Sequence, residues 1–404
     1  ITMENKQNFY PKERPMAREH EKIERDLNVH DKRKFGGMYY TDDATKLHVA
    51  VNTTGDSLTD QLAQKDVVFH HVKYSWEELN TLQAAIGTLF DKHGIHTSGF
   101  LPQKNCIYIG VDYLNEDIRN DIQRDMRGLG YDDEAMYMLV QEGRTAEPDS
   151  MQTDEEGEAA TYDETGDEIE RAANVVTTLK PGCLIQRRDP STGTYHNMWS
   201  LNFAYVFNGT TYLVTAGHVD GKKGAFEDHP AYYVPPASGY PIVNVPTSFN
   251  AANRVKVGVF ARQKYGGNFD FRSIRVTEPN LSFSHTAYNG WNISKVGGSI
   301  SVGALLRICG VTTRYNASYE YGKCDAIQVQ RKAHDKVYKG LFRLNFGANT
   351  GTSGGPVITK DSNGDIRLVG IASSNGISQC WAIPVQYMMD TYNLSMREAG
   401  LINV

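Results

Sequence analysis

The 404-residue sequence predicts an α+β region followed by an all-β domain that closes with a helix. Three observations support this order. Mixed strand and helix patterns fill residues 35–142, an acidic stretch without apolar periodicity fills 143–177, and short apolar runs separated by Gly, Asn and Pro fill 178–404. The charged residues 1–34 lack periodicity and are expected to form an arm or an exposed helix.

Composition and charge limit the classes of function. The net charge is −6 and the pI is about 6.1, so no basic field is available to bind nucleic acid or an anionic membrane. The sequence has no run of about 20 apolar residues, so no membrane-spanning segment is expected. It opens with Ile1 rather than Met, and no signal peptide is visible in it.

The α+β region contains a helix with a clear start signal. Ser75 and Glu78 form a capping-box pattern, in which each side chain can bond the other residue's backbone N–H. Apolar residues follow at helical spacing, at Leu79, Leu82, Ile86, Leu89 and Phe90. Strands are expected at the runs 46–51, 67–72 and 106–111, and a polar helix at 116–127.

The segment between Glu147 and Glu170 carries eleven Asp or Glu and no Lys or Arg. Such a run repels itself and has too few apolar residues to bury a core, so a disordered linker is expected, open to proteolytic cleavage. The alternative is a solvated acidic face of a folded element.

The remainder of the chain predicts a barrel or sandwich of short strands. The expected strands are 201–207, 212–215, 255–260, 270–276, 305–308, 341–346, 356–358 and 368–372, with a helix at 385–396.

Three residues in this part predict one catalytic mechanism. His218 ends a Thr-Ala-Gly-His segment behind an apolar strand, Asp270 begins another strand, and Ser353 lies in Gly-Thr-Ser-Gly-Gly-Pro. The order is His, Asp, Ser, with separations of 52 and 83 residues. Asp220 lies too near His218 in sequence, and no apolar alternation follows Asp228, so Asp270 is the favoured carboxylate.

The residue types fit nucleophilic catalysis. A serine hydroxyl needs a neighbouring base, and a histidine can take its proton and later deliver it to the leaving amine. The carboxylate fixes the histidine tautomer. The N–H groups of Gly351 and Ser353 are expected to form an oxyanion hole, where the loss of one donor costs about 3–4 kcal/mol of barrier. Each motif alone also fits a structural histidine, a turn aspartate or a flexible Gly-rich turn.

The five cysteines show no C-x-x-C spacing, so no zinc site is expected. Cys309 and Cys324 bracket a segment that predicts a β-hairpin. Either a disulfide or two buried thiols would fit this placement.

The segments around His218, Asp270 and Ser353 resemble the trypsin/chymotrypsin superfamily of double β-barrel serine proteases, over about residues 178–400. The run from Ile308 to Ile327 resembles the disulfide-closed hairpin of bacterial streptogrisin and alpha-lytic proteases. The resemblance implies a chymotrypsin-like double β-barrel and a Cys309–Cys324 disulfide.

Those enzymes are made with an N-terminal pro-region that assists folding and then inhibits the product. Residues 35–142 resemble such a pro-domain, which implies a secreted serine endopeptidase precursor with a processing site in the linker. Its partners would be protein or peptide substrates and its own pro-domain, and no cofactor or metal is implied. Val219 stands where the family often has Cys, and Thr352 where it commonly has an Asp that pairs with a freed N-terminus. Removal of the pro-domain is therefore the expected activation.

The predicted substrate-binding residues are Gly347, Ser373, Ser374 and Asn375. Gly347 lies six residues before the nucleophile, at the place of the acidic pocket base in trypsin-like enzymes, so a small or apolar substrate side chain is expected. The other three belong to a strand that resembles the pocket wall, which would pair with extended substrate. Ala372 stands where glutamyl-specific relatives have a histidine.

Two other functions compete with this prediction. One is a heat-shock-type protease, which would carry a C-terminal peptide-binding domain, and few residues follow Met396. The other is a catalytically silent binding protein on the same fold, although such proteins usually lack one member of the triad.

Overall fold

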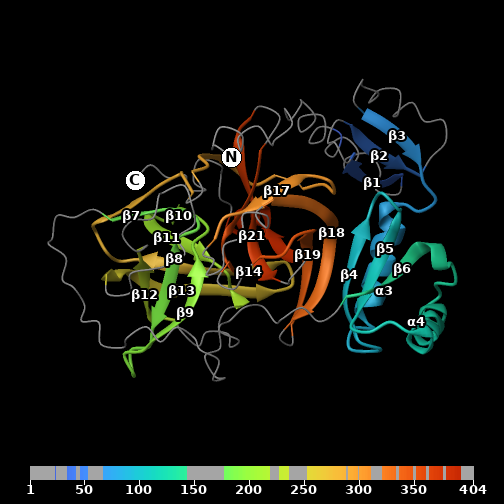
Figure 1. Cartoon of the computed structure of the whole chain (residues 1–404), viewed down its shortest axis with the longest axis horizontal. Coiled ribbons are helices and arrows are strands. Elements are labelled where there is room, and N and C mark those ends of the chain that lie inside the picture. Colours follow the sequence, from blue (N-terminus) through green and yellow to red (C-terminus); the bar gives the residue numbers. More distant parts are fainter. Residues whose placement is uncertain are drawn as a thin grey trace, which may run out of the picture.

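The computed structural model of the chain is dominated by β-sheets, with helices at the N-terminal side and at the end of the last sheet (Figure 1). It describes residues 23, 34–41, 46–52, 67–142, 177–218, 227–235, 253–287, 290–298, 300–310, 321–333, 336–348, 352–360, 364–375 and 379–392. In these ranges, no helix has the length and apolar character needed to cross a membrane. The predicted acidic linker lies outside them except for Thr177, and the predicted arm except for Ile23 and Lys34.

The N-terminal region, residues 34–142, forms two groups of strands. Its elements are β1 (Phe35–Tyr40), β2 (Leu47–Val51), β3 (Val67–His71), α3 (Trp76–Gly87), β4 (Ile95–Leu101), β5 (Cys106–Val111), α4 (Glu116–Gly128), the 3-10 turn η3 (Glu134–Met136) and β6 (Tyr137–Gln141). β2 pairs antiparallel with β1 and parallel with β3, and β5 pairs antiparallel with β4 and parallel with β6. The predicted strands and the polar helix are confirmed, whereas β1, β4 and β6 add strands that were not predicted.

The capping box predicted for α3 is confirmed. Ser75 Oγ accepts a hydrogen bond from the backbone N–H of Glu78 at 3.2 Å, and Glu78 Oε2 accepts one from the N–H of Ser75 at 2.7 Å. Both donors would otherwise lack an intrahelical partner. The predicted apolar stripe of this helix faces a core of α3, α4, β4 and β5, with Leu79, Leu82 and Ile86 buried.

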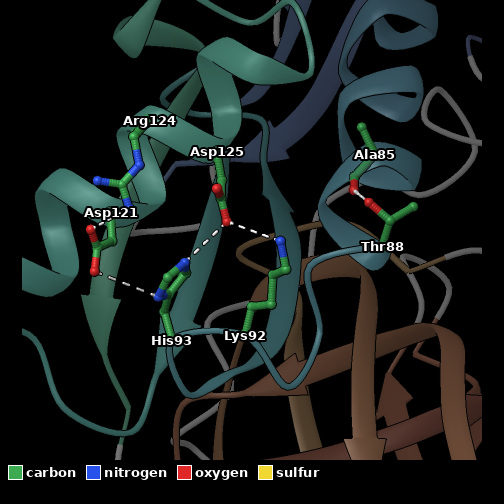
Figure 2. A network of polar contacts seen from close by, with 7 residues as sticks. All are labelled: Ala85, Thr88, Lys92, His93, Asp121, Arg124 and Asp125. Carbon is green, nitrogen blue, oxygen red and sulfur yellow. Dashed lines mark hydrogen bonds and ion pairs between the residues drawn. The ribbon is translucent and has the colours of Figure 1, made fainter.

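A polar network fastens α4 to the turn between α3 and β4 (Figure 2). His93 Nε2 lies 3.0 Å from Asp125 Oδ2, and Lys92 Nζ lies 3.5 Å from the same oxygen. Asp121 Oδ1 accepts from Arg124 at 2.6 Å on the exposed side of the helix. The hydrogen bond from His93 is the main cause that lowers the pKa of Asp125 below its usual range.

Because the pKa of Asp125 is lowered on folding, its stabilisation is present above pH 4 and is lost as the pH falls through the folded-state pKa. Asp125→Asn should therefore lower the melting temperature by a few degrees at pH 7, which corresponds to roughly 0.5–1 kcal/mol, with the difference shrinking below pH 4. Calorimetry of the full chain measures this. The exposed Asp132→Asn serves as control, and an equal effect of both variants would contradict the assignment.

The first large sheet carries seven strands: β8 (Leu184–Arg188), β9 (Tyr195–Ser200), β10 (Ala204–Phe207), β11 (Thr210–Thr215), β12 (Pro230–Val234), β13 (Val255–Gly266) and β14 (Phe269–Val276). Their order is β10-β11-β14-β13-β12-β8-β9. The sheet encloses an apolar core in which Trp199 and Phe260 meet edge to face at 5.3 Å. A short parallel pair, β7 (Thr177–Leu179) and β15 (Leu281–Phe283), adjoins this core. The strand pairs of the described residues do not close this sheet between β9 and β10; for brevity we call the unit the first barrel.

The second large sheet closes on itself. Its strands are β17 (Leu305–Ile308), β18 (Tyr321–Ala333), β19 (Lys336–Leu344), β20 (Pro356–Lys360), β21 (Ile366–Asn375) and β22 (Cys380–Pro384), with β16 (Ile293–Val296) parallel to β21. The circuit runs β17-β20-β21-β22-β19-β18 and returns to β17, so these six strands form a closed second barrel. The helix α5 (Val385–Tyr392) begins where the sequence predicts it.

The strand β18 joins the second barrel to the N-terminal region. It is 13 residues long. Tyr321–Lys323 pair with β17, whereas Ile327, Gln330 and Arg331 pair antiparallel with β4. The sheet of the second barrel therefore continues through β4, β5 and β6 into the N-terminal region, as Figure 1 shows on its right side.

The prediction of a disulfide between Cys309 and Cys324 is contradicted by the structure. All five cysteines are free and buried. β17 and β18 do form the expected antiparallel pair, but its register places Ala304 beside Cys324. Cys309 lies five residues further along the strand, about 16 Å away, whereas a disulfide needs Cα atoms within about 7 Å. Cys309 packs in the core of the first barrel and Cys324 in that of the second.

Candidate active site

The register of the first barrel brings His218 and Asp270 together. β11 pairs antiparallel with β14, with Thr215 opposite Arg272. The chain beyond β11 therefore runs toward the start of β14, so residues 52 positions apart meet. Gly217 makes this approach possible, because a Cβ there would lie 2.7 Å from the carbonyl oxygen of Phe271.

Asp270 is fully buried and accepts four hydrogen bonds. Oδ1 accepts from the backbone N–H groups of Gly217 at 2.8 Å and His218 at 2.7 Å. Oδ2 accepts from His218 Nδ1 at 2.6 Å and from the hydroxyl of Ser373. The proton of the imidazole is thereby fixed on Nδ1, which leaves the lone pair of Nε2 as the base.

Ser353 lies between β19 and β20, on the second barrel. Its carbonyl accepts from the N–H of Ser200 at 2.9 Å, and the N–H of Gly354 donates to Ala372 at 2.8 Å. The Ser353 hydroxyl and His218 Nε2 are both buried, and neither has a hydrogen-bond partner in the described parts of the chain. In the described residues, Ser353 Oγ and His218 Nε2, the predicted nucleophile and base, are therefore not joined by a hydrogen bond.

The other predicted site residues are only partly described. Gly347 is buried just after β19. Ser373 lies in β21, but its side chain contacts Asp270, a role that its position in a pocket-wall pattern did not indicate. The backbones of Ser374 and Asn375 pair with β22, while their side chains lie outside the described set. Gly351, the predicted second oxyanion donor, also lies outside the described residues.

The sequence analysis missed two further residues at this site. Gln263 Nε2 donates to the carbonyl of Gly217 at 2.6 Å, directly behind the histidine. Asn202 is fully buried, and its side-chain amide donates to the carbonyl of Gly354 at 2.9 Å. Neither had a local signal: Asn202 interrupts an apolar run, and Gln263 lies in the extension of β13 beyond its predicted end.

Cys183, Cys324 and Cys380 do not offer an alternative nucleophile. Burial raises the pKa of Cys183 to about 12 and raises those of Cys324 and Cys380 well above the usual value. A reactive cysteine needs a lowered pKa and some exposure, and these have neither. Within the described ranges, no group of three or more His, Cys, Asp or Glu side chains is arranged to hold a metal ion.

Three of the solved structures similar to this chain are those of proteases. One is the alpha-lytic protease homologue N4, with 20% identity and a TM-score of 0.40, covering 54% of this chain and 98% of that one. A second is a glutamic acid-specific serine protease, with 22% identity, a TM-score of 0.38, and coverage of 53% and 98%. A third is Cellulomonas bogoriensis chymotrypsin, with 20% identity, a TM-score of 0.38, and coverage of 55% and 100%. No family model and no curated protein match the sequence.

Proposed function

We propose that the chain is the precursor of a serine endopeptidase. The observation that carries the proposal is the 2.6 Å hydrogen bond between His218 Nδ1 and the fully buried Asp270, beside the loop that bears Ser353. A histidine held in this tautomer has Nε2 available as the base for a neighbouring nucleophile, and we assign the nucleophile to the hydroxyl of Ser353 in the Gly-rich turn.

The reaction follows from these roles. Ser353 Oγ attacks the peptide carbonyl as His218 Nε2 takes its proton, and Asp270 stabilises the imidazolium that forms. The N–H groups of Gly351 and Ser353 receive the oxyanion. The imidazolium then protonates the leaving amine, which leaves an acyl-enzyme on Ser353. Water, activated by the same histidine, hydrolyses the ester and restores the hydroxyl.

Burial of the site supports a latent precursor. Ser353 is 0% exposed and His218 only 2% exposed, so a substrate cannot reach the reacting atoms without a rearrangement. The residue before the nucleophile is Thr352, which carries no charge, and its hydroxyl is buried with no hydrogen-bond partner among the described residues. Activation is therefore assigned to removal of the N-terminal region by cleavage in the 143–177 segment, rather than to an ion pair at residue 352.

The N-terminal region is assigned two roles, as folding assistant and as inhibitor. Its strand β4 extends the edge of β18, and long-range strand pairing of this kind is slow to form without a template. A buried charge cluster supports tight docking: Arg343 of β19 bonds Glu142 at 2.5 Å and Asp325 at 2.8 Å, and its guanidinium lies 4.3 Å from the ring centre of Tyr108.

Specificity for a small or apolar side chain remains the expectation. Gly347 and Ala372 provide no carboxylate, and Ala372 lies in the apolar core of the second barrel with Phe346 and Cys380. Peptides with Ala, Val or Leu before the scissile bond are the first substrates to assay. Secretion is part of the same proposal, since the pro-enzyme organisation is typical of exported proteases.

The test is labelling with a fluorophosphonate probe, which reacts only with an activated serine. A site for a sequence-specific protease is inserted in the 143–177 segment, and intact and cut protein are compared. Ser353 should be labelled after the cut, with little labelling before it and none in Ser353→Ala. The exposed Ser191→Ala is the matched control and should label as the wild type does.

Each other outcome has a definite meaning. Equal labelling of intact and cut protein would support the protease activity but contradict the inhibitory role of the N-terminal region. If folded protein fails to label in either form, the proposed activity is wrong, and a silent binding protein on the protease fold becomes the alternative to pursue.

A further inference from the structure

The geometry points to Asn202 as a positioning residue that holds the nucleophile loop of the second barrel against the first barrel. This inference rests on the proposed function and adds a residue to its machinery. The triad needs such an element, because His218 and Asp270 belong to the first barrel whereas Ser353 belongs to the second.

Asn202 belongs by its backbone to the first barrel and by its side chain to the second. Its N–H donates to the carbonyl of Val214, at the end of β11, at 2.7 Å. Its side-chain Nδ2 donates to the carbonyl of Gly354 at 2.9 Å and to that of Gly370, in β21, at 3.3 Å. One residue thus connects, through its backbone N–H, the strand that leads to His218 and, through its side-chain amide, both the residue after Ser353 and the strand that leads to Ser373.

Ser200 reinforces this connection from two residues away. Its N–H donates to the carbonyl of Ser353 at 2.9 Å, and its own carbonyl accepts from Thr215 Oγ1 at 2.9 Å. Two successive carbonyls of the nucleophile loop, those of Ser353 and Gly354, are therefore bonded to one short segment of the first barrel.

The nucleophile loop approaches that segment closely. Gly354 has a φ of +85°, and a Cβ there would lie 2.3 Å from Thr215 Oγ1 and 2.5 Å from the carbonyl oxygen of Ser200. Only glycine therefore fits this close approach, and the two hydrogen bonds oppose movement of the loop away from the segment. The segment 200–202 therefore sets the position of Ser353 relative to the first barrel.

The chemistry of the side chain is specific to this task. Only hydrogen-bond donors can satisfy two carbonyl oxygens, and the NH₂ group of Asn offers two. Its Oδ1 is buried with no hydrogen-bond partner in the described residues, which lowers stability. A residue selected for packing alone would not retain a desolvated oxygen, and such local costs are typical of functional positions.

Asn202→Leu preserves the size of the side chain and removes both donors. We expect the saturating rate of fluorophosphonate labelling, measured on linker-cut protein, to fall about 100-fold, because a displacement of about 1 Å at the nucleophile has an effect of this size. The probe concentration at half-saturation should stay unchanged, since Asn202 lies behind the loop. An unchanged saturating rate in a folded Asn202→Leu protein would overturn the inference.

Tyr205→Phe is the matched control, because it removes another buried hydrogen bond of the first barrel, between Tyr205 and Ser273 at 3.0 Å. It should lower the melting temperature without changing the labelling rate, whereas a purely structural role of Asn202 predicts that both variants behave alike. If Asn202→Leu does not fold, Asn202→Ser is measured instead, since its short side chain cannot reach both carbonyls. Absence of labelling in the wild type would refute the proposed function rather than this inference.

Discussion

Asp270→Asn should lower kcat for peptide hydrolysis by about 10⁴-fold in the linker-cut protein. The carboxylate holds the Nδ1 proton of His218 and accepts two backbone N–H groups and a hydroxyl. An amide at this position presents an NH₂ group where one of these donors requires an acceptor, so the imidazole shifts to the tautomer with its proton on Nε2. That nitrogen then cannot take the proton of Ser353.

Two variants test the specificity of this prediction. Asp228→Asn changes an exposed carboxylate that pairs with Arg275 at 3.7 Å, and it should leave kcat unchanged. Ser373→Ala removes one of the four donors and should lower kcat by roughly ten- to hundred-fold, because the other three remain. The assignment of Asp270 fails if its asparagine variant keeps more than a tenth of the wild-type kcat.

Glu142→Arg should release the N-terminal region from the linker-cut protein. The substitution places a third cation beside Arg343 and beside Arg331, whose pKa burial lowers only to about 10 and which therefore stays charged at neutral pH. Breaking a buried ion pair in this way costs about 3–5 kcal/mol, so affinity should fall between a hundred- and several-thousand-fold. Gel filtration of the cut protein after dilution measures how much of the N-terminal region remains bound.

The control for this prediction is Glu134→Arg, an equal charge change at an exposed position of the same region. It should leave retention unchanged. Glu142→Gln should have an intermediate effect, since an amide keeps one hydrogen bond to Arg343 and introduces no cation. If the N-terminal region carrying Glu142→Arg stays bound at the wild-type level, strand pairing alone holds it to the second barrel.

Local patterns in the sequence predict where helices and strands form better than they predict which strands pair with one another. The capping box at Ser75 and the apolar stripe behind it define α3, because helix signals act between residues three or four positions apart. Likewise, the strands beside His218 and Asp270 are visible as apolar runs. The pairing of β4 with β18 joins segments more than 200 residues apart, and no local signal can encode it.

The candidate site shows the same contrast between local signals and long-range contacts. The types and order of His218, Asp270 and Ser353 are sufficient to propose the chemistry, because the mechanism restricts which side chains can serve. The roles of Ser373 and Asn202 depend on barrel-to-barrel packing, so they emerge only in three dimensions. The predicted disulfide failed for a related reason: spacing along a hairpin does not fix its register, and the register separates Cys309 from Cys324.

The pairing of β18 with both β17 and β4 has a consequence for the proposed mature enzyme. Removal of the N-terminal region leaves the backbone groups that paired with β4, between Ile327 and Arg331, as an open strand edge. Such an edge can recruit a strand from another molecule and start aggregation. Arg331 and Lys332 place two positive charges at its end, which discourages the approach of a second copy. If the N-terminal region is removed as proposed, the sheet gains an unpaired edge, and we expect solubility after cleavage to depend on these two basic side chains.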